Sequence, residues 1–289
     1  MEPPVIPDDG RPVVLVTGAS SGIGRATAIE FARRRDAHLV LTARREDELV
    51  ETSRLTSRAR TSGTVREHEA ALVPCDLSTP EGVATVVRIV RGIGRLDVLV
   101  NNAGLGGDGT FDSPNTMRDA DRMLALNLRA PIALCHELLP LLRESNGSIV
   151  NVSSVAGLVG TPDAEVYSST KWAITGFSEA LRASQARFGV HVACVHPGPV
   201  PTPGWPHARL ERSWFGSRVL ASNVEVIART CERAARGRGG PSPVRPRTFT
   251  PIPLLRGLAP WLVRALLERA ARSGVRAAIH APLDQENTS

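Results

Sequence analysis

Val13-Val14-Leu15-Val16-Thr17-Gly18-Ala19-Ser20-Ser21-Gly22-Ile23-Gly24 is the stretch of sequence that decides the fold. It opens with a continuous apolar, mostly β-branched run, which is typical of a strand buried in a parallel sheet. Glycines follow, and an amphipathic pattern then predicts a helix through about Arg34. A strand, a Gly-rich turn and a helix form a cradle for phosphate, because glycines admit a close approach and the helix N-terminus offers free N–H groups. A Gly-rich turn can also merely reverse the chain, so the rest of the sequence must decide.

Strand-like apolar runs recur along the chain, and helical patterns separate them. The further strands are expected at 38–42, 71–74, 96–100, 147–152, 190–195 and, as a last edge strand, 247–250. This alternation predicts an α/β fold: a single Rossmann-like, doubly wound parallel sheet of about seven strands, with helices on both faces. We expect three parts along the chain: an N-terminal tail over 1–10, this domain over 11–251, and an amphipathic C-terminal extension over 252–289.

The composition is that of a globular chain with an unevenly placed charge. Of the 289 residues 42% are hydrophobic, and no signal-like or membrane-spanning apolar run is found. The four cysteines are far apart and form no metal-like cluster, so we expect neither a metal nor disulfides, and a reducing cytoplasm. The net charge of +6 arises from residues 229–278, which carry +9. A local excess of this kind argues against nucleic acid as a partner of the whole protein.

Tyr167-Ser168-Ser169-Thr170-Lys171 contains the single tyrosine and the single lysine of the chain. On a helix these two side chains lie on one face, one turn apart. A neighbouring cation favours the phenolate, so Lys171 is expected to lower the pKa of Tyr167 into a range useful for proton transfer. The alternative is a surface tyrosine beside a solvated lysine.

Arg44 follows the second expected strand, where a dinucleotide site meets the adenosine ribose. An acidic residue there would select the free 2′-hydroxyl of NAD, whereas a guanidinium can bind a 2′-phosphate. Arg44 therefore indicates NADP(H) in preference to NAD(H). The alternative is a solvated arginine in an arginine-rich chain.

Six features in this order resemble the short-chain dehydrogenase/reductase family, over about residues 11–235. They are T-G-A-S-S-G-I-G, N-N-A-G (101–104), Asn127, Ser154, Y-S-S-T-K and P-G-P-V-P-T (197–202). The resemblance, to the NADP-preferring branch, implies a catalytic tetrad. Tyr167 would be the acid/base, Ser154 would bond the reacting carbonyl, and Asn127 would anchor a water that connects Lys171 to solvent. Lys171 would also hold the nicotinamide ribose.

The resemblance further implies a set of cofactor contacts along the carboxyl ends of the strands. These contacts are Gly18, Ser20, Ser21, Gly22, Ile23 and Gly24 at the phosphates, Asp76 and Leu77 at the adenine, Asn102, Ala103 and Gly104 at the adenosine, and Pro197, Gly198, Val200 and Thr202, with Tyr167 and Lys171, at the nicotinamide end. Asn101 is expected to bridge two strands instead.

The function expected from these residues is hydride transfer between NADP(H) and a carbonyl or secondary alcohol. Ser154 and Tyr167 suit it, because a donor and a proton source stabilise the charge that develops on the oxygen. The alternatives are a catalytically silent dinucleotide sensor or scaffold, and a membrane-surface interaction protein. Resemblance also implies a homodimer or homotetramer that pairs through the helices after the fourth and fifth strands.

Two segments bear on the substrate and on partners. Trp205, His207, Trp214 and Phe215 follow the sixth strand and predict a lid over a hydrophobic substrate, or else a buried aromatic core. A helix expected to start at Pro260 has Leu258, Trp261, Leu262, Ala265 and Leu266 on one face and Arg264, Glu268 and Arg272 on another. It would pack against the domain or a second subunit, or lie on an anionic membrane surface.

Overall fold

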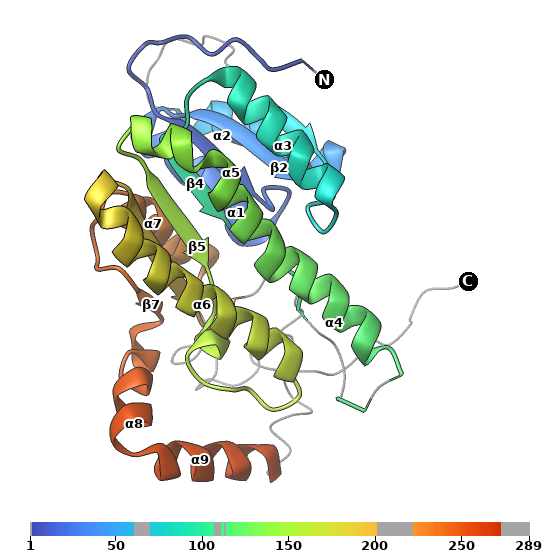
Figure 1. Ribbon diagram of the computed structural model, residues 1–289, viewed down its shortest axis with the longest axis vertical. Helices are drawn as coiled ribbons and strands as arrows, with labels where there is room; N and C mark the ends of the chain where they lie inside the picture. Colours follow the sequence, from blue (N-terminus) through green and yellow to red (C-terminus); the bar gives the residue numbers. More distant parts are fainter. Residues whose placement is uncertain (1, 61–69, 107–110, 113, 201–221, 273–289) are drawn as a thin grey trace.

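Burial of the first strand on both faces places it inside a parallel sheet. The computed structural model describes residues 2–60, 70–106, 111–112, 114–200 and 222–272. Its sheet has seven parallel strands in the order β3-β2-β1-β4-β5-β6-β7 (Figure 1). Every residue of β1 (Val13–Thr17) is buried, which explains its continuous apolar pattern. The strand order reverses beside β1, as in doubly wound folds. The expected α/β Rossmann-like fold is confirmed.

Helices alternate with the strands along the chain. The remaining elements are α1 (Gly22–Arg35), β2 (His38–Ala43), α2 (Glu46–Ala59), β3 (Ala71–Pro74), α3 (Pro80–Ile93), β4 (Val98–Asn101), α4 (Thr116–Leu124), a π-helical turn (Ala125–Arg129), α5 (Ala130–Glu144), β5 (Ser148–Val152), a 3₁₀ turn (Val155–Gly157), α6 (Glu165–Gln185), a 3₁₀ turn (Ala186–Phe188), β6 (His191–Pro197), α7 (Val224–Ala235), β7 (Val244–Arg245), a 3₁₀ turn (Arg247–Phe249), α8 (Ile252–Leu258) and α9 (Pro260–Arg272).

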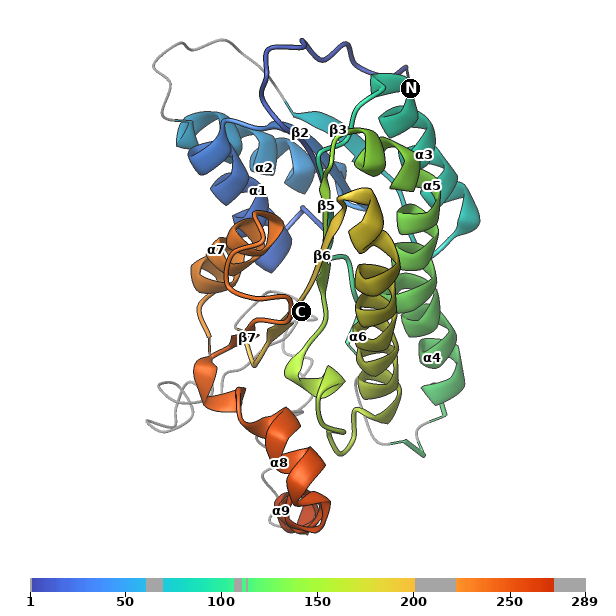
Figure 2. The same cartoon turned by 60° about the vertical axis from the view of Figure 1, so that its left-hand side comes forward.

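The helices cover the sheet in two layers (Figure 2). On one face α1, α2 and α7 pack over a core that includes Phe31, Leu49 and Ile227. On the other face α3, α5 and α6 pack over a second core that includes Ile89 and Leu138. Both cores pack on the same sheet, because successive side chains along each strand point to opposite faces. The carboxyl ends of these parallel strands therefore form one continuous edge.

The edge strand and one helix junction differ from the sequence-based expectation. The last strand is Val244–Arg245, paired with the end of β6, and not 247–250. Pro246 follows it and has no N–H to donate to a ladder, so the strand stops there and the chain curls into a 3₁₀ turn. The expected interruption at Asn127 is a π-helical turn that joins α4 to α5 without a break.

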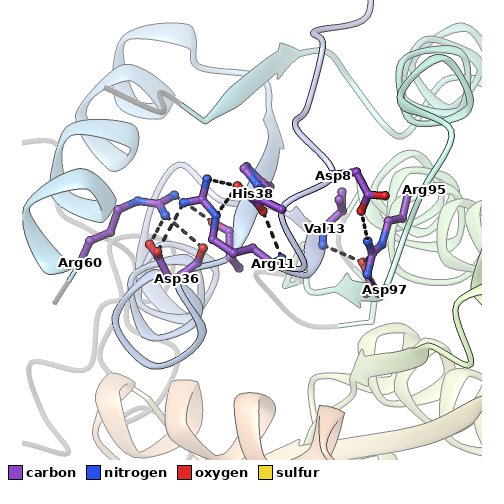
Figure 3. A network of polar contacts seen from close by, with 10 residues as sticks. Asp8, Arg11, Val13, Asp36, His38, Arg60, Arg95 and Asp97 are labelled. Carbon is purple, nitrogen blue, oxygen red and sulfur yellow. Dashed lines mark hydrogen bonds and ion pairs between the residues drawn. The ribbon is translucent and has the colours of Figure 1, made fainter. Parts of the chain in front are cut away.

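Ion pairs close the opposite edge of the sheet, where the strands begin (Figure 3). Asp97 accepts a 2.8 Å hydrogen bond from the Val13 amide and pairs with Arg95 at 2.9 Å. Arg11 pairs with Asp9 at 2.6 Å and with Asp36 at 3.3 Å. These contacts attach the chain before β1 to the starts of β2 and β4. The hydrogen bond from Arg11 outweighs burial and holds the pKa of Asp9 well below its ordinary value.

The C-terminal elements project beyond the carboxyl edge of the sheet. In both views α8 and α9 lie past the ends of the strands, at the end of the molecule where α4 also begins (Figures 1 and 2). Arg256 of α8 stacks on the Trp172 ring of α6, with 3.7 Å between the guanidinium carbon and the ring centroid. No helix in the described parts of the chain is long and apolar enough to cross a membrane.

Candidate active site

Hydrogen bonds between side chains and backbone hold the turn after β1 against the end of β4. The Thr17 hydroxyl accepts hydrogen bonds of 2.9 Å from the amides of Asn102 and Ala103. The Asn102 side-chain amide donates to the carbonyls of Thr17 and Gly18, at 2.9 and 3.3 Å. We expect Asn102 at the adenosine of the cofactor. In the structure its side-chain amide stabilises the turn through these two hydrogen bonds. Asn101 bridges to Asn151 of β5 at 2.9 Å, which confirms its expected bridging role.

Close approach of backbone explains the glycines of this turn. Gly18 has a φ of +67°, and a Cβ there would lie 2.8 Å from the Ala103 Cα. A Cβ on Gly24 would lie 2.1 Å from the Gly18 carbonyl oxygen. The turn is thus tight, and α1 begins at Gly22 with no acidic residue in its first turn and no side-chain cap on Ser21. Free N–H groups and the positive helix end suit a pyrophosphate, so the residues present fit a dinucleotide.

Arg44 and Arg45 follow β2, and Arg45 lies at the Gly-rich turn after β1. Arg45 Nη2 donates to the hydroxyls of Ser20 and Ser21, at 3.4 and 3.3 Å. Arg44 is exposed and near enough to Asp76 for its charge to act on that carboxyl. Sequence reasoning selected Arg44 and missed Arg45. The sequence shows two consecutive arginines at this point. Which of the two guanidinium groups lies at the Gly-rich turn depends on where α2 starts, and Arg45 is the residue directly before that helix.

Asp76, after β3, is a structured carboxylate. Its Oδ1 accepts hydrogen bonds from the amide and hydroxyl of Ser78, at 2.9 and 2.8 Å. Burial raises the pKa of Asp76, but the Ser78 hydrogen bonds and the Arg44 charge outweigh it and leave the pKa below its ordinary value. Gly82 in α3 allows this turn, because a Cβ there would lie 2.0 Å from the Asp76 carbonyl oxygen. Leu77 beside it is buried.

Ser154, Tyr167 and Lys171 lie together at the same edge, where β5 ends and α6 passes over it. Ser154 Oγ accepts a 3.1 Å hydrogen bond from the Ala156 amide and lies 3.4 Å from the Pro197 carbonyl oxygen. It also hydrogen-bonds the Tyr167 phenol. Lys171 Nζ is 5.6 Å from the Tyr167 ring centroid and donates to the Val152 carbonyl at 3.0 Å. The neighbouring Ser153 hydroxyl donates to the Lys171 carbonyl at 2.8 Å, so it supports α6.

Burial shifts the pKa values of Tyr167 and Lys171 in the directions that favour their neutral forms. It raises the pKa of Tyr167, an effect that the hydrogen bond from Ser154 partly offsets. It lowers the pKa of Lys171 to about 8. The expected lowering of the Tyr167 pKa by Lys171 is not found in this structure, because burial outweighs the hydrogen bond from Ser154 and leaves the pKa above its ordinary value.

Asn127 sits in the π-helical turn and is buried. Its Oδ1 accepts from the Leu105 amide at 2.8 Å, and its Nδ2 donates to the Leu105 carbonyl and to Thr170 Oγ1, at 2.9 and 3.1 Å. A Cβ on Gly104 would meet both Asn127 Oδ1 and Lys171 Nζ, at 3.2 and 3.5 Å, so all three residues share one region. π-helical turns are frequent at functional sites because they re-aim a side chain. The water relay through Asn127 stays a prediction.

His196, at the end of β6, is a site residue that sequence reasoning missed. Its side chain is buried, and Nδ1 lies 3.2 Å from the Ser154 carbonyl oxygen. A carbonyl only accepts, so Nδ1 carries the proton. Burial lowers the pKa of His196 to about 4, which keeps the ring neutral. The sequence feature that indicates His196 is its position at the end of a strand, directly before Pro197-Gly198.

The far end of the expected cofactor site follows β6. Gly198 packs beneath the C-terminal segment, since a Cβ there would lie 2.9 Å from the Phe249 ring. Val200 is buried. Thr202 and the expected lid residues Trp205, His207, Trp214 and Phe215 lie outside the described residues.

The comparisons with known proteins agree with this geometry. Residues 12–212 match the profile of a family described as short chain dehydrogenase. The chain is 32% identical over 257 residues to "11-beta-hydroxysteroid dehydrogenase-like 2" of Arabidopsis thaliana, covering 89% of this chain and 80% of that protein.

Two solved structures are similar throughout the fold. A short-chain dehydrogenase from Sphingobium yanoikuyae in complex with NADPH is 27% identical, with a TM-score of 0.68, over 96% of this chain and 98% of that one. L-sorbose reductase from Gluconobacter frateurii, in complex with NADPH and L-sorbose, is 29% identical, also with a TM-score of 0.68, over 81% and 94% of the two chains.

Proposed function

Since the chain belongs to the short-chain dehydrogenase/reductase family and is an oxidoreductase of alcohols and carbonyls, we propose that it transfers hydride to or from NADP(H). The observation that carries this proposal is the joining of Ser154, Tyr167 and Lys171 at the sheet edge that holds the Gly-rich turn. A binding protein without catalysis has no use for a phenol hydrogen-bonded to a serine at that place. The silent sensor is therefore the weaker alternative.

The residues of the cluster divide the work on the substrate oxygen. The nicotinamide supplies or accepts the hydride when it is bound. Ser154 donates a hydrogen bond to the substrate oxygen, and Tyr167 gives it a proton in reduction or takes one in oxidation. Lys171 favours the charged phenol and holds the ribose. His196 keeps the Ser154 backbone in place through its 3.2 Å contact.

Preference for NADP(H) is supported by the pair of arginines after β2. Arg45 reaches the hydroxyls of Ser20 and Ser21, and Arg44 stands exposed beside it. Together they offer guanidinium groups where the ribose 2′-phosphate is expected. The two similar structures described above hold NADPH. Because a hydrogen bond to a charged group contributes about 1.5–3 kcal/mol, we expect NADPH to bind roughly 10- to 100-fold more tightly than NADH.

A hydrophobic substrate is supported by the segment that follows Ser154. Leu158 and Val159 are only partly buried there, next to the cluster that would hold the reacting oxygen. Partly exposed apolar side chains beside a few fixed polar groups are the usual lining of a small-molecule site.

The test is a titration followed by a substrate panel. NADPH and NADH are titrated into the full chain by calorimetry, with Arg44→Ala and Arg45→Ala beside the wild type. Either variant should lose affinity for NADPH and keep its affinity for NADH. Oxidation of NADPH is then followed by absorbance against ketones and aldehydes of increasing apolar size. Equal affinities for the two nucleotides would overturn the NADP(H) preference, and tight binding without turnover on any carbonyl would favour the sensor.

A further inference from the structure

Large apolar side chains are exposed at one end of the molecule. Among the described residues eleven such side chains are exposed, and eight of them belong to α8, α9, α4 and Phe111, five residues before α4. Leu258 is 77% exposed and Trp261 65% exposed. The eight are Phe111, Met117, Leu124, Leu254, Leu255, Leu258, Trp261 and Leu266. Single exposed apolar residues are normal on a protein surface, whereas a concentration on neighbouring elements marks an interaction surface.

These elements share the end of the molecule at which the strands finish. α8, α9 and the start of α4 lie beyond the carboxyl edge of the sheet in both views (Figures 1 and 2). The N-terminal segment lies at the opposite end. The surface therefore lies beyond the edge at which the strands finish, and these side chains are exposed instead of being packed against the domain.

The charge of the projecting helices selects the partner. α8 and α9 carry Arg256, Arg264, Arg269 and Arg272 against Glu268, a net charge of +3. A second copy of the chain would meet this surface with the same surface in a two-fold interface, which would bring two net charges of +3 together. An anionic surface has the complementary charge. Apolar side chains flanked by arginines are the pattern of helices that lie in a lipid interface.

We propose that this end of the molecule rests on a membrane surface that contains anionic lipids. Leu258 and Trp261 enter the boundary between headgroups and acyl chains, and Arg264 and Arg269 pair with lipid phosphates and carboxylates. The contact that we propose is peripheral, made by the exposed faces of α8 and α9. In this orientation the carboxyl edge of the sheet faces the lipid bilayer, in which apolar carbonyl compounds dissolve. The surface itself is independent of the proposed reaction and of the NADP(H) preference.

The test is flotation of the full chain with vesicles of phosphatidylcholine, with and without 30 mol% phosphatidylserine. The wild type should float with the anionic vesicles and stay in solution with the neutral ones. The double variant Leu258→Glu/Trp261→Glu should lose at least about tenfold in vesicle partitioning, because it places two charges in the apolar contact. Arg264→Gln and Arg269→Gln should each lose about fivefold on the anionic vesicles.

Val5→Glu is the matched control, because Val5 is a 97% exposed apolar residue of the N-terminal segment. This variant should float like the wild type. Far-ultraviolet circular dichroism and NADPH titration show whether each variant remains folded, without reference to vesicles. Wild type that stays in solution with both vesicles would overturn the proposal. Equal flotation with neutral vesicles would overturn the anionic partner, and a dimer lost only in the double variant, without flotation, would identify a second copy instead.

Discussion

Tyr167 and Lys171, the proposed catalytic pair, show at the residue scale how burial shifts the pKa of a side chain. Each is the single residue of its type in the chain, and both sit where burial disfavours their charged forms. Ser154 offsets part of that effect at the phenol. With a pKa of about 8, Lys171 still carries its charge at pH 7 but loses its proton more readily than an exposed lysine.

Replacing Tyr167 by Phe should remove the proton donor and keep the shape of the site. We expect turnover to fall by at least ~100-fold, the lower end for general acid–base catalysis, with NADPH affinity nearly unchanged. Steady-state kinetics and NADPH titration measure the two quantities. Ser169→Ala is the control, since that exposed hydroxyl only bonds back to the Glu165 carbonyl. Near-normal turnover of Tyr167→Phe would contradict the assignment.

Lys171→Met should stabilise the cofactor-free chain at neutral pH. The pKa of Lys171 is about 8 in the fold and 10.5 ordinarily, so the folded state carries the cost of a buried charge at pH 7. The difference corresponds to roughly 3 kcal/mol, an upper bound because the bond to Val152 is lost too.

The same shift gives a pH dependence of stability. Between pH 8 and pH 10.5 the unfolded chain binds more protons at this lysine than the folded chain does, so the wild type gains stability as the pH rises. Urea denaturation of the wild type and Lys171→Met at pH 7 and pH 10 should therefore show a difference that shrinks with pH. A difference that is equal at both pH values would contradict the burial of the charged amine.

At the element scale the two edges of the sheet do different work. The amino edge is closed by ion pairs and by the Asp97 bond to the Val13 amide, the first donor of β1 (Figure 3). The carboxyl edge has tight glycine turns and the side chains of the candidate active site. In open parallel sheets ligands bind at the carboxyl ends of the strands, so the edge closed by ion pairs is opposite the one that we expect to bind the cofactor.

Asp97→Ala should destabilise the fold by about 1–3 kcal/mol, because it leaves the part-buried Val13 amide without its acceptor. Asp8→Ala is the matched control: Asp8 pairs with the same Arg95, but its side chain is 92% exposed, against 16% for Asp97. We expect a change below about 0.5 kcal/mol for Asp8→Ala. Urea denaturation of both variants measures the contrast, and similar losses would show that Arg95, rather than the Val13 bond, matters.

For the whole molecule we expect a dimer or tetramer that pairs through α5 and α6. Ile132 of α5 is 36% exposed, an apolar residue on an outer helix of the domain. In a two-fold pairing Ile132→Glu places two carboxylates at one interface and should shift the protein toward the monomer. Light scattering coupled to size exclusion measures the mass. Val5→Glu should leave it unchanged, and a monomeric wild type would contradict the expectation.

The sequence by itself determined the fold class and which residues share the edge of the candidate site, for a local physical reason. Strand, glycine turn and helix recur at fixed intervals, and the carboxyl ends of parallel strands must meet at one edge. The sequence pattern therefore predicts Ser154, Tyr167, Lys171 and the glycines of the turn at one edge, and only Thr202 of the proposed contacts falls outside the described residues.

What only the tertiary structure decided concerns contacts between segments that are distant in the sequence. Arg45 reaches Ser20 and Ser21 because α2 starts at Glu46, and His196 matters because β6 lies beside the end of β5. The edge strand lies at Val244–Arg245, where the amides of His196 and Gly198 donate hydrogen bonds to the carbonyls of Pro243 and Arg245. Exposure of Leu258 and Trp261 likewise depends on what packs beside them. Periodicity fixes which face of an element is apolar, but only the assembled chain determines whether that face is covered.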